Sequence, residues 1–113
     1  MARSTSNTPH QICLVFSLRP GAEEEYDRRH RTVWPELLEQ IRAAGITQNA
    51  VLRTGTSVIV FVAHPDDVVA ALARVGASQP ARRWNEWFAD LMATEPSEAI
   101  EVWRMDPADG RSG

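Results

Sequence analysis

The order of strand-like and helix-like segments predicts an α+β domain of the ferredoxin-like type. Three observations support this: a βαββαβ order of segments, a length of 113 residues that suffices for one hydrophobic core, and an apolar fraction of 43%. In such a fold the helices cover one face of an antiparallel sheet. We therefore expect a single domain at 11–105 between a disordered leader (1–10) and a disordered tail (106–113), both rich in small polar residues.

The first strand and the first helix are predicted from their periods. QICLVFSL, at 11–18, alternates with the period of a strand, and RPG at 19–21 ends it. Over 22–44 the spacing of apolar residues is helical, and Gly45 is the glycine that commonly follows a helix.

The remaining elements follow from turn signals. ITQNAVLR (46–53) and SVIVFVAH (57–64) are separated by TGTS, which predicts a hairpin. PDDVVAALARVG (65–76) predicts a short helix with a proline at its start and acidic residues in its first turn. A second helix is expected over about 78–94, and AIEVWRM (99–105) is expected as the last strand.

Apolar residues occur on both faces of the predicted sheet, although helices cover only one. The residues that suggest this are Cys13, Val15, Val51, Ile59, Phe61 and Trp103. A second subunit that packs sheet against sheet would cover the uncovered face, so we expect a homodimer. The alternative is a sheet face left partly exposed.

Composition excludes several classes of protein. A net charge of −3 and a pI near 5.6 argue against a nucleic-acid binder, which needs surplus Lys and Arg. Cys13 is the only cysteine, so there is neither an intrachain disulfide nor a thiolate cluster for zinc, and a reducing cytoplasm fits. The leader lacks the apolar run of a signal peptide, and no segment approaches the roughly 18 apolar residues of a membrane span. His10, His30 and His64 lack the spacing of a metal site, so no metal is expected.

The first helix carries two polar rings on its apolar face. At 100° per residue, Tyr26, His30, Val33 and Leu37 form one stripe, while the neighbouring arginines and glutamates point elsewhere. Pro35 cannot donate a backbone hydrogen bond, so we expect a kink or a restart there. The tyrosine and histidine are either satisfied core residues or a site, and a histidine suits proton transfer near neutral pH.

Several stretches resemble one known family. EEYDRRHRTVWPELLEQIRAAGI, at 24–46, resembles the helix that identifies the L-rhamnose mutarotase family, and RRWNEWFADLM (82–92) and EVW (101–103) are similar to later family segments. This resemblance implies a dimeric α+β barrel of ferredoxin-like subunits that needs no metal and no organic cofactor. It also implies the interconversion of the α and β anomers of L-rhamnose.

The resemblance also implies roles for particular residues. In the family the histidine of this helix is the acid/base group and the tyrosine lies nearby in the sugar site, which corresponds to His30 and Tyr26. Trp84 matches the first tryptophan of a family pair, whose ring can cover the apolar face of a sugar.

The sequence departs from the family at two positions. Asn85 stands where the family has its second tryptophan, and Asn49 stands where a tyrosine that contacts sugar is usually found. Trp87, one turn from Trp84, either fills that space as a substrate contact or packs in the core with Phe88 and Leu91.

Three functions therefore remain open. The first is a cytoplasmic sugar mutarotase that acts on L-rhamnose or a related 6-deoxy-hexose. The second keeps the barrel and His30 but acts on a larger, less polar molecule, as a cofactor-free cyclase, isomerase or decarboxylase. The third is a binding module in which Tyr26 and His30 are core residues.

Overall fold

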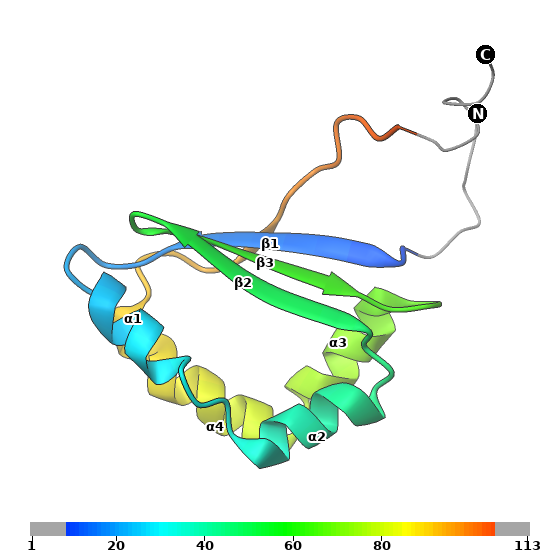
Figure 1. The fold of residues 1–113 in the computed structure, drawn as a ribbon, viewed down its shortest axis with the longest axis horizontal. Helices are drawn as coiled ribbons and strands as arrows, with labels where there is room; N and C mark the ends of the chain where they lie inside the picture. The colour runs from blue at the N-terminus through cyan, green and yellow to red at the C-terminus, as the bar shows by residue number, and fades with distance from the viewer. Residues whose placement is uncertain (1–8, 106–113) are drawn as a thin grey trace.

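The computed structural model describes residues 9–105, which form one sheet with helices on a single face (Figure 1). The elements are β1 (Gln11–Ser17), α1 (Glu23–Arg29), α2 (Pro35–Ala43), β2 (Gln48–Thr54), β3 (Ser57–Ala63), α3 (Val68–Gly76), α4 (Gln79–Phe88), a 3₁₀ turn η1 (Ala89–Leu91) and β4 (Ser97–Glu98). The antiparallel sheet has the order β2-β3-β1-β4. The predicted ferredoxin-like α+β class and the predicted hairpin are confirmed.

The core lies between the inner face of the sheet and the helices. One cluster joins the sheet to α1 and α4 and consists of Phe16, Leu18, Tyr26, Val58, Phe88 and Leu91. A second cluster joins α2, α3 and α4 and consists of Leu37, Ala44, Ala71, Val75 and Ala81. Trp84 packs against both clusters and so lies where the two halves of the helical layer meet.

The long helix predicted over 22–44 is broken before Pro35, as expected. α1 ends at Arg29 with His30 as its C-cap, and Trp34 has an extended backbone (φ −59°, ψ 133°). Pro35 then occupies the first turn of α2, where its missing N–H has no helical partner to lose. The break leaves His30 at the end of a helix.

Two helices begin or end differently from the prediction. α3 begins three residues later than expected because the Asp67 carboxylate caps it, accepting from the Ala70 N–H at 3.0 Å. The acidic residues therefore precede the first turn. Ser78 caps α4 in the same way, accepting from the Ala81 N–H at 3.4 Å, and α4 tightens into η1 well before residue 94.

The prediction of a last strand at 99–105 is wrong for this chain on its own. Strand β4 is only Ser97–Glu98, paired with β1, and residues 99–105 lie outside any strand. β1 begins at Gln11, so the edge next to β4 runs out of partners shortly after Ala99, whose N–H donates to the Cys13 carbonyl at 2.8 Å. Trp103 is consequently exposed rather than part of a sheet face.

The domain begins slightly earlier than predicted. The carbonyls of Pro9 and His10 accept from the backbone N–H groups of Val68 (3.0 Å) and His64 (2.8 Å), so these two residues belong to the fold. The rest of the predicted leader and the tail at 106–113 lie outside the described residues. In the part that the structure describes, no helix has the length and apolar character that crossing a membrane requires.

His64 has a structural role at the C-terminal end of α2. Its Nε2 lies 3.0 Å from the Ala44 carbonyl, and its Nδ1 accepts from the N–H groups of Asp66 (2.9 Å) and Asp67 (3.1 Å). The neutral ring therefore carries its proton on Nε2. Gly45, with φ +83°, passes so close that a Cβ there would lie 2.9 Å from Nε2, which explains the glycine.

Candidate active site

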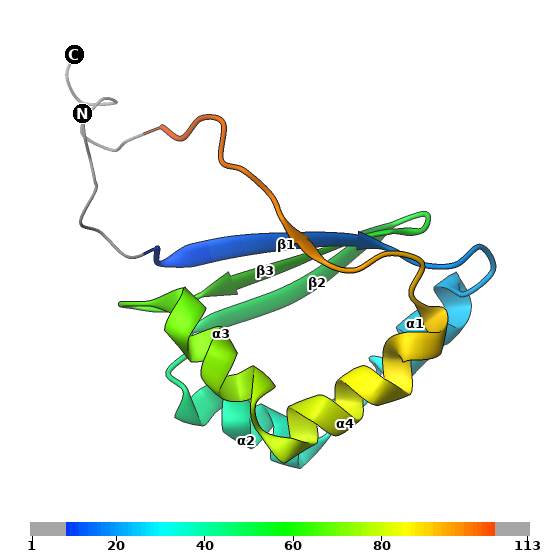
Figure 2. The ribbon, with the colours of Figure 1, turned by 180° about the vertical axis from the view of Figure 1, so that it is seen from behind.

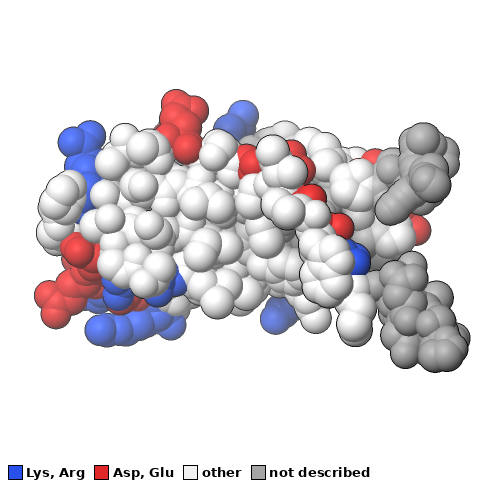
Figure 3. Space-filling model, turned by 90° about the horizontal axis from the view of Figure 1, so that it is seen from above, with Lys and Arg blue, Asp and Glu red and all other residues white. Residues whose placement is uncertain are grey.

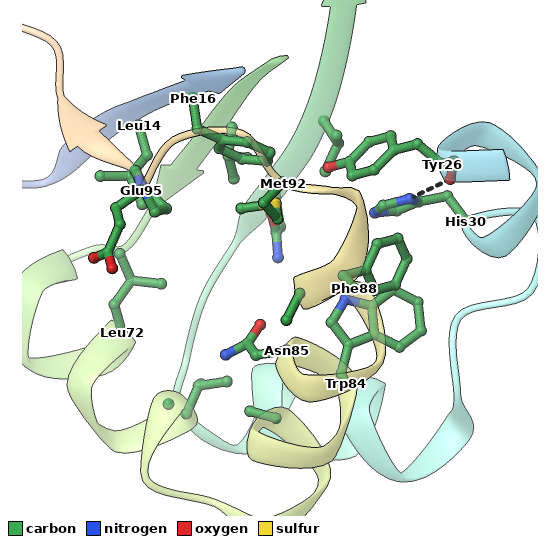
Figure 4. A pocket seen from close by; sticks show the side chains of 18 of the residues that line it. Leu14, Phe16, Tyr26, His30, Leu72, Trp84, Asn85, Phe88, Met92 and Glu95 are labelled. Carbon is green, nitrogen blue, oxygen red and sulfur yellow. Dashed lines mark hydrogen bonds between the residues drawn. The ribbon is translucent and has the colours of Figure 1, made fainter. Parts of the chain in front are cut away.

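A cavity of about 850 Å³ lies between the inner face of the sheet and helices α3 and α4, with α1 at one end (Figure 4). Most of its lining is apolar and comes from the sheet strands β1, β2 and β3, from helices α3 and α4, and from the segment 92–96 that follows them. The polar side chains that line it are Tyr26, His30, Asn49, Asn85, Thr94 and Glu95. Such an arrangement, an apolar pocket with a few convergent polar groups, is typical of a small-molecule site.

His30 enters this cavity with a defined orientation. Its Nδ1 lies 3.0 Å from the backbone carbonyl oxygen of Tyr26, one turn earlier. A carbonyl only accepts, so in the neutral ring Nδ1 carries the proton and Nε2 has a free lone pair. Figure 4 shows the imidazole directed toward the cavity from the end of α1. The contact with the Tyr26 carbonyl therefore prepares Nε2 to accept a proton from a bound molecule.

Aromatic rings surround the imidazole and restrict its motion. Ring centroids lie 4.5 Å away for Tyr26, 4.9 Å for Phe88 and 5.5 Å for Trp84, the last in a T-shaped contact. Two of these rings come from α4, so His30 is held between α1 and α4 rather than by its own helix alone.

Tyr26 is the most enclosed of the polar residues in the cavity. Its side chain is only 4% exposed and makes edge contacts with Phe16 and Phe88, at centroid distances of 6.2 and 5.3 Å. In Figure 4 its hydroxyl end points toward the cavity beside His30. Desolvation in this apolar wall, with a smaller contribution from the Asp27 carboxylate, raises the pKa of Tyr26 to about 12. The phenol is therefore a neutral hydrogen-bond donor at physiological pH.

The raised pKa of Tyr26 predicts an alkaline loss of stability. The unfolded phenol titrates near its ordinary value of 10.0 and the folded one near 12, so stability is constant below pH 10 and falls as pH rises from 10 to 12. The total loss is about 3 kcal/mol, at 1.36 kcal/mol for each pKa unit. Tyr26 is the only tyrosine, so tyrosinate absorbance reports this residue alone. A midpoint near 10 in folded protein would contradict the buried environment.

Trp84 and the two asparagines line the same cavity. Trp84 is half-buried on α4, and its ring forms a wall next to His30. Asn49, on β2, and Asn85, on α4, are exposed residues of the lining. The structure therefore brings Tyr26, His30, Trp84, Asn49 and Asn85 together around one space.

Trp87 is not brought into the cavity. Its ring stacks on Trp34 at a centroid distance of 5.4 Å and a plane angle of 19°, and the Arg29 guanidinium lies 5.1 Å from its centroid. It also contacts Phe88 edge-on at 5.3 Å. Trp87 is 39% exposed and lies outside both core clusters, so the ring belongs neither to the cavity lining nor to the buried core.

Arg29 links α1 to α4, a role that the sequence pattern did not reveal. Its side chain donates to Glu25 at 2.7 Å, to the Trp87 carbonyl, and to Asp90 at 3.3 Å, and its guanidinium lies 5.6 Å from the Phe88 centroid. All the arginines of this helix were expected to point away from the stripe of Tyr26 and His30, yet the Arg29 side chain is only 11% exposed. At about 100° per residue Arg29 lies beside that stripe and Arg28 lies on the opposite side of the helix, so the spacing was a signal that could have separated the two.

Glu25 holds both of these neighbouring arginines. Hydrogen bonds from Arg28 and Arg29 lower the pKa of the Glu25 carboxyl to about 2, so it stays ionised throughout the ordinary pH range. The ion pairs of Glu25 with Arg28 and Arg29 therefore persist over that pH range.

Thr94 and Glu95 are two further polar lining residues that the sequence did not indicate. Thr94 was assigned to the end of a helix, but the chain has already left α4 and η1 there. Its hydroxyl oxygen accepts from the Ser17 N–H at 2.8 Å, which anchors this loop against β1.

Titratable side chains do not gather elsewhere in a way that suggests a metal centre. Among residues 9–105, no group of three His, Cys, Asp or Glu side chains lies close enough to hold an ion. His30 and His64 are engaged by different backbone carbonyls in different parts of the fold.

Comparison with known proteins identifies the family. A family model described as L-rhamnose mutarotase matches residues 11–107, nearly the whole chain. The chain belongs to the L-rhamnose mutarotase family. It is 37% identical over 85 residues to an L-rhamnose mutarotase of Burkholderia ambifaria, covering 75% of this chain and 82% of that one. A relative of the same description from Phocaeicola vulgatus is 27% identical over 95 residues, covering 79% and 91%.

Solved structures confirm the fold. An L-rhamnose mutarotase from Formosa agariphila matches with a TM-score of 0.68 at 19% identity, covering 87% of this chain and all of that one. A structure described as an antibiotic biosynthesis monooxygenase from Nitrosomonas europaea matches with a TM-score of 0.64 at 17% identity, covering 81% and 86%. The family resemblance seen in the sequence is thus confirmed, and with it the class of enzyme, an isomerase that interconverts sugar anomers.

Proposed function

We propose that this chain interconverts the α and β anomers of L-rhamnose or a related 6-deoxy-hexose, with His30 and Tyr26 moving the protons. The observation that supports it is the pair of groups offered to one cavity: the Nε2 lone pair of His30, fixed by the Nδ1 contact with the Tyr26 carbonyl, and the neutral Tyr26 hydroxyl. Anomer interconversion needs one acceptor and one donor of a proton and no net change of atoms.

The two groups suffice for a balanced reaction. Nε2 of His30 takes the proton of the anomeric hydroxyl, the bond from the anomeric carbon to the ring oxygen breaks, and the phenol gives its proton to the ring oxygen. The products are an open-chain aldehyde, an imidazolium and a phenolate. The carbonyl group turns about its carbon–carbon bond, and the protons return as the ring closes on the other face.

The raised pKa of Tyr26 is compatible with this role. The ring oxygen released as an alkoxide is more basic than a phenolate. Transfer of the proton from the Tyr26 phenol, with its pKa of about 12, to that oxygen is therefore still favourable when the ring opens. The phenolate that results is destabilised by its apolar wall, which favours return of the proton when the ring closes.

The cavity fits a sugar but is roomy for a single one. Its volume of about 850 Å³ lies in the upper part of the roughly 300–1,000 Å³ range of sites for drug-sized ligands. The amides of Asn49 and Asn85 can hydrogen-bond sugar hydroxyls, whereas aromatic rings would have offered stacking. These features also favour the second candidate, a cofactor-free conversion of a larger and less polar molecule at the same His30.

We further propose that two copies associate through the outer face of the sheet. Since Leu14, Phe16 and Val60 line the cavity, alternate residues of the same strands face away from the helices. These are Cys13, Val15, Ala50, Leu52, Ile59 and Phe61, which lie opposite one another across the strands. Figure 3 shows this face with a broad uncharged centre and charged side chains toward its ends.

We also propose a cytoplasmic location, because a chain with a single cysteine and no possible intrachain disulfide suits a reducing compartment.

Proton NMR magnetisation exchange between the α and β anomeric signals tests the activity directly. We expect the protein to accelerate exchange for L-rhamnose, with L-fucose as a comparison sugar, and we expect Tyr26→Phe to retain the fold but slow exchange about 10- to 100-fold, as loss of a proton donor does. No acceleration with either sugar by folded protein would reject the mutarotase and leave the larger-ligand candidate.

A further inference from the structure

Strand β2 carries one row of side chains toward the helices. Asn49 and Val51 line the cavity, and Arg53 continues their row because side chains two residues apart on a strand share a face. Arg53 lies beyond the cavity lining, next to the turn that joins β2 to β3. Figures 1 and 2 both show this turn and α1 at the same end of the molecule. The row therefore leads from the cavity wall to the helix that holds the two polar rings.

Arg53 connects β2 to α1 through a bidentate ion pair. Its Nε and Nη2 groups donate to the two carboxylate oxygens of Asp27 at 2.8 and 2.6 Å, and its Nη1 donates to the Gly55 carbonyl at 2.7 Å. The Arg53 side chain is 27% exposed and that of Asp27 is 45% exposed. A guanidinium that binds both oxygens of a carboxylate fixes direction as well as distance. Arg53 thus joins α1, the hairpin turn and β2 at one point.

Asp27 is linked to both rings of the site along α1. It follows Tyr26 directly, and its backbone carbonyl accepts from the His30 N–H at 3.1 Å. Its carboxylate contributes to the raised pKa of Tyr26, second to desolvation. Hydrogen bonds from Arg53 lower the pKa of the Asp27 carboxyl, so the ion pair stays charged near neutral pH. A displacement of Asp27 would therefore move both rings.

Helix α1 is held to α4 by a different residue. Arg29 binds the Trp87 carbonyl and Asp90 on that side, whereas Arg53 holds α1 to the sheet. α1 is seven residues long, and a helix this short depends on tertiary contacts for its place. Loss of the Arg53 side chain would leave α1 attached to α4 but less firmly held to β2.

We propose that Arg53 is a positioning residue that acts through Asp27. It holds α1, with the proton-transfer groups His30 and Tyr26, at a fixed distance from the β2 wall that carries Asn49. This role rests on the anomer exchange proposed above. Proton transfer needs the acid/base groups placed correctly against a sugar that other elements hold, and a misplacement of about 1 Å can lower a rate about 100-fold. The ion pair therefore contributes to the rate without touching the sugar.

Arg53→Leu tests this role against a matched control, Arg28→Leu. Arg28 also donates through Nε and Nη2 to both oxygens of a carboxylate, but its partner Glu25 lies on the same helix, so the pair holds no second element. In NMR magnetisation exchange over a range of L-rhamnose concentrations, Arg53→Leu should lower kcat about tenfold and change KM less than about threefold. Arg53→Lys keeps the charge but not the bidentate geometry, so it should lose less. Arg28→Leu should keep the parent kcat.

Two further readouts separate positioning from a general loss of stability. His30→Ala combined with Arg53→Leu should be no slower than His30→Ala alone, because Arg53 acts through the ring that it positions. The ring-proton NMR signals of His30 should also move in folded Arg53→Leu, since the nearby rings of Trp84 and Phe88 make these signals sensitive to position. The signals of His64 should stay in place.

The outcomes separate this role from the proposed function. If the parent is active and Arg53→Leu has the same kcat as Arg28→Leu, the positioning role is wrong and the mutarotase stands. A lower kcat with unmoved His30 signals, or with additive losses in the double variant, also overturns the role. A folded parent that accelerates exchange of neither L-rhamnose nor L-fucose rejects the proposed function and this role with it.

Discussion

Replacing His30 by alanine is expected to slow anomer exchange at least about 100-fold, because a positioned acid/base group contributes roughly 10²- to 10⁴-fold to such reactions. The structure supports this magnitude: His30 is the histidine of the cavity lining, and its Nε2 is the lone pair prepared by a backbone contact. NMR magnetisation exchange on L-rhamnose measures the effect. His30→Gln, which keeps a donor and comparable volume but cannot shuttle a proton, should be nearly as slow.

A second histidine provides the matched control for this result. His64→Ala removes a ring of the same kind that is also held by backbone groups, but outside the cavity. It should lower the free energy of unfolding by about 1–2 kcal/mol through its lost hydrogen bonds and leave kcat near the parent value. Equal losses of kcat in the two folded variants would show that the effect of His30 is structural.

Replacing Arg29 by leucine is expected to lower the free energy of unfolding by about 2–3 kcal/mol. The Arg29 side chain is 11% exposed, and its guanidinium donates to Glu25, Asp90 and the Trp87 carbonyl and lies over the rings of Trp87 and Phe88. The Trp87 carbonyl loses its charged donor and a cation–π contact goes with it, each costing about 1 kcal/mol or more. Urea unfolding followed by tryptophan fluorescence measures the change, because Trp84 and Trp87 lie next to this contact.

Arg28→Leu serves as the control because Arg28 shares the same carboxylate. Its side chain is 59% exposed and pairs with Glu25 on the helix surface, so its loss should leave the free energy of unfolding nearly unchanged. Arg29→Leu should also slow anomer exchange at temperatures where it is folded, because Phe88 and α4 hold the His30 ring. If both arginines have the same small effect, the contact between α1 and α4 is not important for stability.

The first three strands and the break at Pro35 were predictable because they depend on local chemistry. Alternation along 11–18 indicates a strand with two faces. A proline has no backbone N–H to donate, so it ends or interrupts a helix that would otherwise run through it. The stripe that joins Tyr26 to His30 was equally local, since residues four apart share a helix face.

The errors have a common cause. Residues 99–105 are strand-like in composition but have no strand beside them in their own chain, and pairing is a property of two segments. For Trp87 the sequence left a substrate contact and core packing open, and contacts with Trp34 and Arg29 keep its ring out of the cavity lining.

The sequence by itself determined the fold class, the family and the two rings that share a helix face, because period, turn residues and side-chain chemistry act over a few residues. Only the packed structure shows which nitrogen of His30 is free, that Trp87 stays outside the cavity lining, and that residues 99–105 leave the sheet. Those outcomes depend on contacts between segments far apart in the chain, and their energies arise only when the segments have packed.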